Sequence, residues 1–417
     1  MSEDPRSLLR DLFDSAVRAV SAEACLPAAL DDWQCDGRTL VIAVGKAAAA
    51  MAAVAAARLP GAVSGLVVAP PDHHGAPHLL PDGFETIEAG HPVPNAGSLA
   101  AAERALALAH QLGPKDRLLA LISGGGSALL ALPATGVDLA TKAAVTRALL
   151  RSGAAIGEMN IVRKHLSRIK GGRLARAAAP ARVTTLLISD IPGDDPAMIA
   201  SGPTVADSPN LADARAILDR YVLDAPCGVR AALTDPANET PDIAAGDVRI
   251  VARAADAFTA TARLAATRGL KVVMLGDDLE GEARSLGAEH AALALRASEP
   301  QLILSGGETT VRVVNRAGRG GRNVEYLLGL ALALDGAPGI WGLACDTDGI
   351  DGTEDNAGAL LTPDSLARGR ALGLDPHELL DTNRAYDFFA ALGDLVVTGP
   401  TRTNVNDFRA ILTGVCA

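Results

Sequence analysis

Short runs of β-branched and other apolar residues alternate along the chain with longer stretches rich in alanine and leucine. We predict strands at residues 39–44, 65–69, 84–89, 117–122, 183–188, 249–251, 271–275, 301–304, 340–344 and 394–397. The longer stretches predict helices at residues 47–58, 98–112, 139–151 and 259–268. Because the strand runs stay apolar on both faces, they are typical of parallel strands covered by helices. The alternation predicts an α/β architecture.

A break in this pattern predicts the domain organisation. The stretch 207–247 has no strand signal, is rich in Pro, Asp and Asn, and contains one helix-like segment at 213–221. A chain of 417 residues is long enough for two or three domains, each with its own core. We therefore predict a first domain over residues 1–240 and a second over 241–417.

Composition and charge remove several classes of function. The formal net charge is −11 and aromatic residues make up 3% of the chain, which argues against nucleic acid as a partner. The five cysteines are scattered without a CxxC pair, so neither a disulfide framework nor a structural zinc site is indicated. No apolar run is long enough for a membrane span, and the first residues lack a signal pattern. We expect a cytoplasmic protein without a membrane partner, and its oligomeric state stays open, a homo-oligomer included.

Small and acidic residues follow nearly every predicted strand. In open α/β sheets, ligands bind beyond the carboxyl ends of the strands. The residues found there are Gly45-Lys46, Ser123 to Ser127, Ser189-Asp190, Ser305 to Glu308, Cys345 to Asp348 and Thr398-Gly399. The pattern predicts a ligand site built from several strand ends.

Two of these segments are glycine-rich and are candidates for phosphate binding. The first consists of Ser123, Gly124, Gly125, Gly126 and Ser127, and the second of Gly306, Gly307 and Glu308. Successive backbone N–H groups can converge on an anion there, and the dipole of a following helix would favour its charge. The alternative is a tight turn that needs positive φ. The GxGxxG and Walker A patterns fail, because Leu129, Leu40 and Ala47 stand where they need other residues.

Two cations are candidates for contact with a phosphate or carboxylate. Lys46 follows a strand and opens a helix, where it could offer a compact charge, although a solvated first-turn lysine is the alternative. The segment 316–322, Arg-Ala-Gly-Arg-Gly-Gly-Arg, ends at Arg322 and could close over a phosphoryl group. Its alternative is a basic surface turn.

Aspartates at two strand ends are candidates for a magnesium site. Asp190 and Asp194 lie in the segment Asp-Ile-Pro-Gly-Asp-Asp, and Asp348 lies in a second acidic loop over 346–352. Mg²⁺ takes one or two carboxylates together with phosphate oxygens and waters. The second loop is not an EF-hand, because Ile350 and Ala357 occupy ligand positions. The alternative for both loops is an Asx-turn with capping aspartates.

Taken in order, the segments resemble the glycerate 2-kinases of the MOFRL type. The matching segments are AVGKAA (43–48), GHPVPN (90–95), LISGGGSALL (121–130), KHLSRIKGGRLA (164–175), LLISDIPGDDPAMIASGPT (186–204), LSGGET (304–309), GRGGRNVEYLLGLAL (318–332), CDTDGIDGTEDNAGAL (345–360) and TGPTRTNVNDFRAIL (398–412). Each segment alone is weakly specific, whereas the ordered series from about residue 40 to the C-terminus is highly specific. Two positions depart from the family pattern: Val324 replaces a usual glutamine and Arg402 a usual glycine.

The resemblance implies a fold and an activity. The fold is a larger N-terminal Rossmann-like α/β/α domain and a smaller C-terminal α/β domain, with the active-site cleft between them. The activity is ATP-dependent phosphorylation of D-glycerate at its 2-hydroxyl, with Mg²⁺. Lys46 and Arg322 match positions regarded as active-site cations in the family.

These features give one hypothesis for the chemistry and two alternatives. The backbone of residues 124–127 would hold ATP phosphates, and Lys46 and Arg322 would bracket the γ-phosphate and the glycerate carboxylate. Asp190 would orient the accepting hydroxyl or share Mg²⁺ with Asp194 or Asp348. The first alternative is an NAD(P)H-dependent hydroxypyruvate reductase, which the missing GxGxxG disfavours. The second is a non-catalytic sensor of hydroxy acids.

Overall fold

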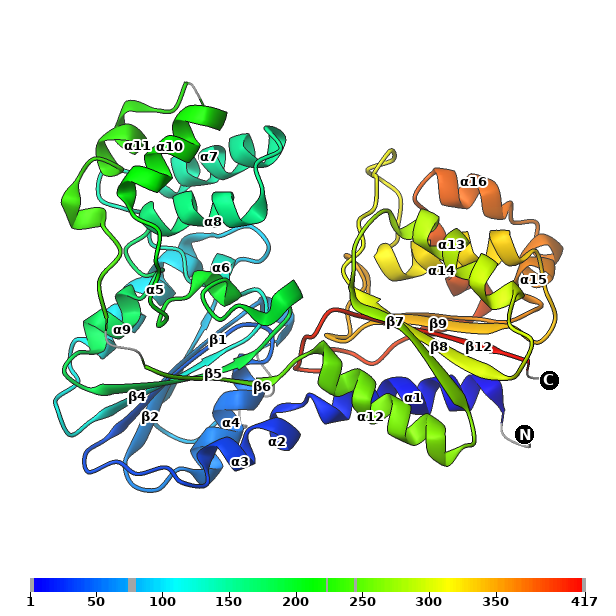
Figure 1. The fold of residues 1–417 in the computed structure, drawn as a ribbon, viewed down its shortest axis with the longest axis horizontal. Coiled ribbons are helices and arrows are strands. Elements are labelled where there is room, and N and C mark those ends of the chain that lie inside the picture. The colour runs from blue at the N-terminus through cyan, green and yellow to red at the C-terminus, as the bar shows by residue number, and fades with distance from the viewer. Residues whose placement is uncertain (1–3, 74–79, 223, 244–245, 415–417) are drawn as a thin grey trace. The chain divides into compact units, whose positions relative to one another are not determined.

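The chain forms two compact units in the computed structural model, which describes residues 4–73, 80–222, 224–243 and 246–414 (Figure 1). One unit is Ala22–Val251, and the other joins Met1–Ser21 to Ala252–Ala417. This division differs from the predicted cut between residues 240 and 241. The first helix, α1 (Pro5–Ala19), belongs to the C-terminal unit because it buries an apolar face there, with Phe13 packed on Phe408 at 5.7 Å between ring centroids.

The unit Ala22–Val251 contains a six-stranded sheet in the order β3-β2-β1-β4-β5-β6. The strands are β1 (Thr39–Val44), β2 (Val63–Ala69), β3 (Phe84–Glu88), β4 (Arg117–Ile122), β5 (Arg182–Ile188) and β6 (Asp247–Ala252). Neighbours from β3 to β5 pair in parallel. This is the doubly wound order, and it reverses between β1 and β4. The predicted α/β class with a Rossmann-like N-terminal domain is therefore confirmed.

Helices cover this sheet and also form a cluster of their own above it (Figure 1). They are α2 (Ala22–Cys25), α3 (Pro27–Leu30), α4 (Ala48–Arg58), α5 (Ala96–Ala109), α6 (Gly126–Leu129), α7 (Leu139–Arg151), α8 (Ile156–His165), α9 (Arg173–Ala178), α10 (Leu211–Tyr221) and α11 (Cys227–Ala232). Helices α7, α8, α10 and α11 share an apolar core that includes Leu149, Val162, Leu218 and Val229. The stretch without strand signals thus supplies two helices of this cluster.

The second unit contains a mixed six-stranded sheet in the order β11-β10-β9-β12-β8-β7. Its strands are β7 (Lys271–Leu279), β8 (Gln301–Gly307), β9 (Trp341–Asp346), β10 (Gly358–Leu361), β11 (Leu395–Val396) and β12 (Asp407–Thr413). Among the described strands of this sheet, β7 and β8 pair in parallel, and the other pairings are antiparallel. The parallel interpretation is therefore wrong here, because a strand that is buried on both faces looks the same in either direction.

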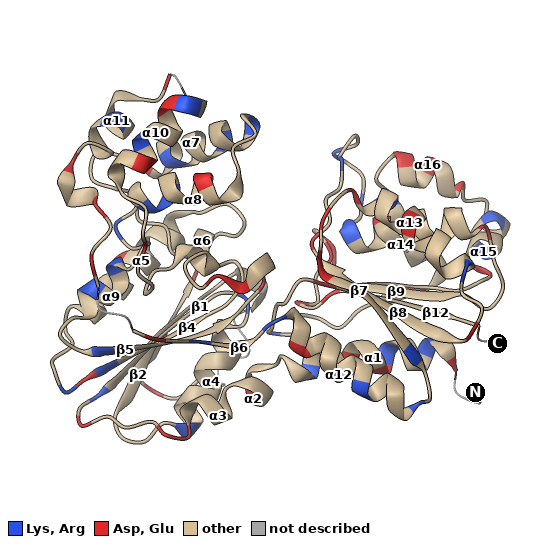
Figure 2. Ribbon diagram, in the orientation of Figure 1, with Lys and Arg blue, Asp and Glu red and all other residues tan. Residues whose placement is uncertain are grey.

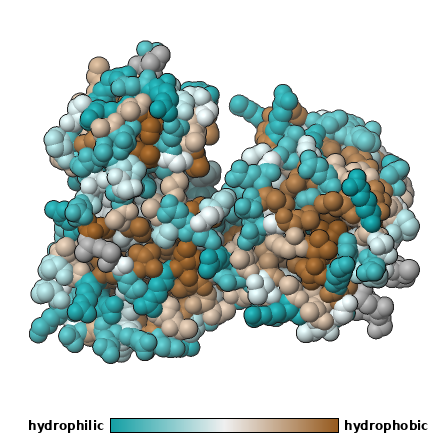
Figure 3. Space-filling model, in the orientation of Figure 1, coloured by the Kyte–Doolittle hydropathy of each residue, from teal (hydrophilic) through white to brown (hydrophobic). Residues whose placement is uncertain are grey.

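Helices pack on both faces of the second sheet. Helices α1 and α12 (Ala254–Thr267) pack together on one face, and α13 (Ala283–Leu295) and α14 (Arg322–Leu334) pack together on the other (Figure 1). The remaining helices are α15 (Ser365–Ala371), α16 (Pro376–Asp381) and α17 (Ala385–Leu392). In the described part of the chain, every helix is too short or too polar to cross a bilayer. Apolar residues still reach the surface in patches among polar ones in both units (Figure 3).

The packing of α1 predicts that the N-terminal helix stabilises the C-terminal unit. Phe13→Ala should lower the free energy of unfolding of that unit by about 3–5 kcal/mol, because a buried aromatic ring is lost and a cavity is left. Differential scanning calorimetry would show the change as a lower transition temperature. Leu150→Ala, at an exposed position of α7, is the control and should stay within about 0.5 kcal/mol of the parent. A Phe13→Ala protein that melts like the control would contradict this packing role.

Candidate active site

The carboxyl ends of β1 and β4 bring the Lys46 segment against the first glycine-rich loop. The Lys46 N–H donates to the carbonyl of Gly124 at 3.0 Å, and the Ala47 N–H donates to Ser123 Oγ at 3.0 Å. Gly45 has φ 125°, and a Cβ at this position would lie 2.2 Å from Ser123 Oγ. Only glycine lets the two strand ends approach this closely. The two segments lie at the point where the strand order reverses.

The first glycine-rich loop leads directly into α6, which is a single turn. Gly126 and Ser127 are its first residues, and the helix ends at Leu129. From the sequence, the dipole of a following helix was expected to favour a bound anion. That expectation is wrong for this loop, because a four-residue helix has almost no macrodipole. Attraction for an anion must come from charged side chains instead.

Two cationic side chains bind Ser127, the last residue of this loop, and a third, Lys142, lies close to them. Ser127 Oγ accepts hydrogen bonds from Arg163 Nη2 at 2.6 Å and from Lys170 Nζ at 2.8 Å. Lys170 Nζ also donates to the Ser127 carbonyl at 2.6 Å, and Lys142 Nζ donates to the Leu166 carbonyl at 2.7 Å. None of these three cations was among the residues predicted from the sequence. The usable signal was the scarcity of lysine, because three of the six lysines in the chain lie between residues 142 and 170.

Burial leaves this cluster short of negative charge. Lys170 is 2% exposed and Lys142 is 7% exposed. Burial, together with the charge of nearby Arg163, holds the pKa of both lysines well below its ordinary range. Burial also lowers the pKa of Arg163. Among the described residues, none of these three cations has an ion pair with a carboxylate.

The end of β5 contributes a loop with strained backbone beside the same site. Asp194, Ala200 and Ser201 have φ of 54°, 51° and 61°, which non-glycine residues rarely adopt. Ser201 Oγ lies 2.9 Å from Ser127 Oγ, so this loop contacts the glycine-rich loop. The hydroxyl of buried Ser189 has no hydrogen-bond partner among the described residues, and half-buried Asp190 follows it. Such strain is typical of functional loops.

In the other unit, Arg322 is held by three carboxylates at the start of α14. Its Nε, Nη1 and Nη2 atoms each lie 2.7 Å from a carboxylate oxygen, of Asp407, Glu308 and Asp346 in turn. Burial alone would lower the pKa of Arg322, but the charges of these carboxylates raise it. Figure 2 shows acidic segments gathered at one end of this sheet, beside β7 and β9. Arg322 is therefore a fully charged and firmly oriented cation.

Asp407 is a site residue that sequence reasoning missed. It begins β12, which runs antiparallel to β9 and places Asp407 opposite Asp346. Asp407 also accepts hydrogen bonds from Asn323 Nδ2 at 2.8 Å and from Arg409 Nη2 at 2.5 Å. The sequence prediction considered the carboxyl ends of parallel strands, whereas the amino end of an antiparallel neighbour reaches the same edge of the sheet.

The aspartates of the second acidic loop have local structural partners. The buried Asp348 carboxylate accepts the Ile350 N–H at 2.8 Å, which is the Asx-turn considered as the alternative. Asp351 accepts the N–H groups of Asn323 at 3.0 Å and Val324 at 2.9 Å, and so caps α14. Within the described ranges, no group of three or more His, Cys, Asp or Glu side chains is arranged to hold a metal ion. A magnesium role for Asp190, Asp194 and Asp348 stays a prediction.

The second glycine-rich segment has a packing explanation. Gly306 and Gly307 are the last residues of β8. A Cβ on Gly307 would lie 2.2 Å from the backbone of Leu279, and one on Gly306 would lie 2.6 Å from the Phe258 ring. The carboxylate of Glu308 binds Arg322. These contacts account for both glycines without a ligand, and phosphate binding by this segment stays a prediction.

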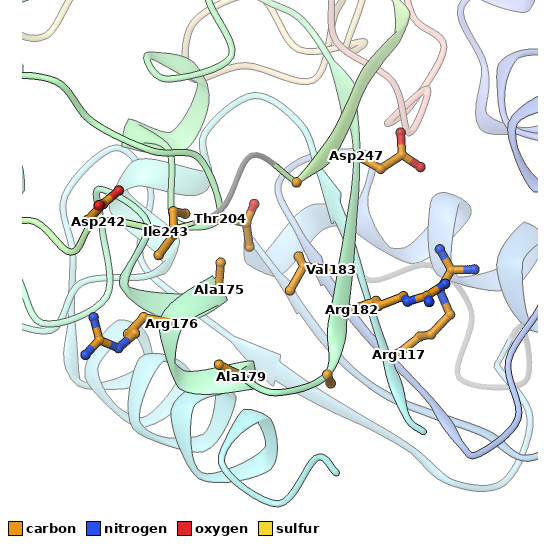
Figure 4. A pocket seen from close by; sticks show the side chains of 12 residues that line it. Arg117, Ala175, Arg176, Ala179, Arg182, Val183, Thr204, Asp242, Ile243 and Asp247 are labelled. Carbon is orange, nitrogen blue, oxygen red and sulfur yellow. The ribbon is translucent and has the colours of Figure 1, made fainter. Parts of the chain in front are cut away.

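A pocket of about 530 Å³ lies elsewhere in the unit Ala22–Val251 (Figure 4). Arg117, Arg182 and Asp247, which line it, stand at the amino ends of β4, β5 and β6. Open α/β sheets bind their ligands at the opposite edge, where Ser123 and Ser189 lie. We therefore place the candidate site at the carboxyl edge of the sheet and not in this pocket at its amino edge.

Comparisons with known proteins agree with the ordered motifs. The model "Domain of unknown function (DUF4147)" matches residues 8–234, and the model "MOFRL family" matches residues 301–407. A D-glycerate 2-kinase of Thermotoga maritima is 36% identical over 97% of this chain and 98% of its own length. A crystal structure of glycerate kinase from that organism has a TM-score of 0.88 and covers 98% of this chain and 99% of its own. This chain belongs to the MOFRL-type glycerate 2-kinase family.

Within this family, two relatives from Agrobacterium vitis carry a different name. A protein of Agrobacterium vitis, provisionally named a hydroxypyruvate reductase, is 52% identical over 98% of this chain and 94% of its own length. The relatives named glycerate kinase are phosphotransferases, and membership in their family makes this chain an enzyme of that class.

The structure explains how the two departures from the family pattern are tolerated. The Val324 side chain is buried in the apolar core of its unit, where no polar partner is needed. Arg402 has φ 61°, a left-handed conformation that glycine adopts at little cost and arginine at about 1–2 kcal/mol. Neither change removes a charge from the candidate site.

The cap formed by Asp351 predicts a measurable dependence on pH. Burial raises the pKa of Asp351 to about 6, and the nearby Asp407 charge adds to the rise. Because the folded-state pKa exceeds the unfolded value of about 3.9, the protonated carboxyl favours the folded state, and this contribution is lost as pH rises from 4 through 6. In the parent, this titration should lower the free energy of unfolding by about 2–3 kcal/mol as pH rises. Asp351→Asn removes the titrating group and should lack this contribution. Urea unfolding of both proteins at pH 4 and pH 6.5 measures it, and equal losses would contradict the prediction.

Proposed function

We propose that the protein is an ATP-dependent glycerate 2-kinase, which transfers the γ-phosphoryl group of ATP to the 2-hydroxyl of D-glycerate in the presence of Mg²⁺. The observation that carries the proposal is the glycine-rich loop at the reversal of strand order, where Lys46 adjoins the loop and two cations, Arg163 and Lys170, bind Ser127. Phosphoryl transfer needs little covalent chemistry from the protein, and mainly positioning and charge neutralisation. Transfer to the 2-hydroxyl rests on the family.

Residues of this chain have separate tasks in the proposal. The backbone of residues 124–127 holds phosphate oxygens, and Lys46 places a compact charge beside them. Arg322 adds a second charge, whose three carboxylate partners keep it protonated and fix its direction. Asp190, at the end of β5, orients the accepting hydroxyl.

Magnesium fits the carboxylates that the chain offers. Mg²⁺ needs only one or two protein carboxylates when phosphate oxygens and waters complete its octahedron. Asp190 and Asp194 stand in one loop after β5 and meet this need, with Asp348 as a further candidate. When bound, the ion neutralises charge on the transferred phosphoryl group.

A reductase is the second candidate, because the two relatives from Agrobacterium vitis carry that name. In dinucleotide-binding folds the first turn after β1 presents free N–H groups to the pyrophosphate. Here the Lys46 and Ala47 N–H groups donate to Gly124 and Ser123. Leu129, where the fingerprint needs glycine, lies in the apolar core. These contacts favour the kinase.

The proposal predicts a defined product. Incubation of the protein with D-glycerate, ATP and MgCl₂ should produce 2-phosphoglycerate and ADP in equal amounts. ³¹P NMR measures both products. A 3-phosphoglycerate signal would keep the kinase and contradict the site of transfer. Intact ATP, together with NADH consumption on hydroxypyruvate, would replace the kinase with the reductase. Glycerate binding without either reaction would indicate a sensor.

Lys46 is predicted to matter for the chemical step. Lys46→Ala should lower kcat by about 10²–10³-fold, because a preorganised charge beside the transferred phosphoryl group is lost. Steady-state kinetics measure the effect, and circular dichroism checks that the variant is folded. Lys115→Ala, at an exposed lysine of the same unit, is the matched control. Unchanged turnover in folded Lys46→Ala would remove this residue from the mechanism.

A further inference from the structure

A second, smaller pocket lies next to the glycine-rich loop and has one apolar wall and one cationic wall. Its volume is about 220 Å³. Pro92, Val93 and Pro94 form part of the apolar wall, together with residues of α6 and α7. The cationic wall contains buried Lys142 and Lys170, half-buried Arg163 and the exposed Arg147, and two of these, Arg163 and Lys170, donate to the Ser127 hydroxyl. All of these residues belong to one unit, so the pocket is complete within it.

Several N–H donors of Lys142, Arg163 and Lys170 make no hydrogen bond within the described part of the protein. Lys170 uses two of its three N–H donors within the protein, both on Ser127, and Lys142 uses one, on the Leu166 carbonyl. Arg163 uses two of its five, one on Asn160 Oδ1 at 3.0 Å and one on Ser127 Oγ. The remaining donors belong to side chains that line a cavity large enough for a ligand.

Buried charges without a counter-charge are costly, and an anion would offset that cost. Removing a cation from water is unfavourable unless an opposite charge and hydrogen bonds compensate it. The neighbouring Lys164 illustrates the compensated case, because it pairs with Asp207 at 2.7 Å although both side chains are buried. Lys142, Arg163 and Lys170 have no such carboxylate among the described residues. The lowered pKa values of Lys142 and Lys170 reflect the free-energy cost of this imbalance.

The size of the pocket selects a small anion. One water occupies about 30 Å³ of liquid volume, so 220 Å³ corresponds to the space of about seven waters. A three-carbon hydroxy acid fits this space. The pocket is smaller than the roughly 300–1,000 Å³ that drug-sized ligands occupy, so a small anion suits it better than a whole nucleoside triphosphate.

We propose that this pocket binds the carboxylate of the three-carbon acid substrate, with Arg163 and Lys170 as its charged donors and Lys142 as a further charge. The inference rests on the proposed kinase function and makes it more specific. It assigns the carboxylate to these residues instead of Lys46 or Arg322, and it leaves Lys46 to the phosphates.

Direct binding tests the pocket without any need for turnover. Isothermal titration calorimetry with D-glycerate, in the absence of nucleotide, should show binding to the parent protein. Lys170→Met, which keeps the length of the side chain and removes its charge, should raise the Kd by at least about 30-fold. Arg163→Met should act in the same way, and Arg163→Lys should lose less because it keeps a charge. Lys115→Met is the matched control and should bind like the parent.

Stability separates a binding role from a structural one. If Lys170 is retained for a ligand, Lys170→Met should melt at the same temperature as the ligand-free parent or higher, because a costly buried charge is gone. If Lys170 only supports Ser127, the variant should melt lower and bind glycerate normally. The second result would overturn the proposal.

Kinetics then separate this inference from the proposed function. In the kinase assay, Lys170→Met should raise the KM for glycerate at least about 30-fold and leave the KM for ATP within about two-fold. Phosphotransfer with an unchanged KM for glycerate would overturn the pocket and keep the kinase. If the parent binds glycerate without phosphotransfer and Lys170→Met abolishes that binding, the pocket assignment stands and the kinase proposal is overturned. A variant that loses affinity for ATP or inorganic phosphate, and not for glycerate, would show that the pocket takes a phosphate group and would overturn the carboxylate assignment.

Discussion

The close approach of β1 and β4 at their carboxyl ends is the constraint on which the candidate site depends. Gly45 lies so near Ser123 that a single methyl group would not fit, and the Ser123 hydroxyl ties the start of α4 to the loop after β4. This contact places Lys46 beside Gly124 and directs the glycine-rich loop into α6. It also uses the N–H groups that a dinucleotide fold would leave for its cofactor. The sheet order that dinucleotide-binding folds use for their cofactor therefore supports a different chemistry in this protein.

The two units have charge imbalances of opposite sign. Around Ser127, buried cations lack carboxylate partners among the described residues, whereas Arg322 is surrounded by more carboxylates than it can neutralise. Each imbalance costs stability in the free protein. Strained backbone in the loop that contains Ala200 and Ser201 adds to this cost. Local conflicts of this kind are expected at sites where a ligand supplies the missing interactions.

Much of the fold could be predicted from the sequence, because burial leaves a direct record in the pattern of apolar residues. The strand at 39–44 and the helix at 139–151 match β1 and α7 to the residue. Strand direction leaves no such record. No strand was predicted at β12, whose buried residues include Asp407 and Arg409, and its antiparallel pairing with β8 and β9 follows from long-range contacts alone. Helix α1 likewise shows its apolar face in the sequence, but only the tertiary structure assigns that face to the C-terminal unit.

The same division holds for the candidate site. The sequence by itself determined the glycine-rich loop and Lys46, since residues that directly follow strands must meet at one edge of a parallel sheet. It also determined the family, through the order of many weak motifs. Only the tertiary structure decided that Lys170 and Arg163 meet at Ser127, because α7 and α8 fold back over the loop from a separate helical cluster. Asp407 reaches Arg322 for a similar reason, through the reversed direction of β12. Charge balance depends on which side chains meet in space, and the linear sequence does not specify that.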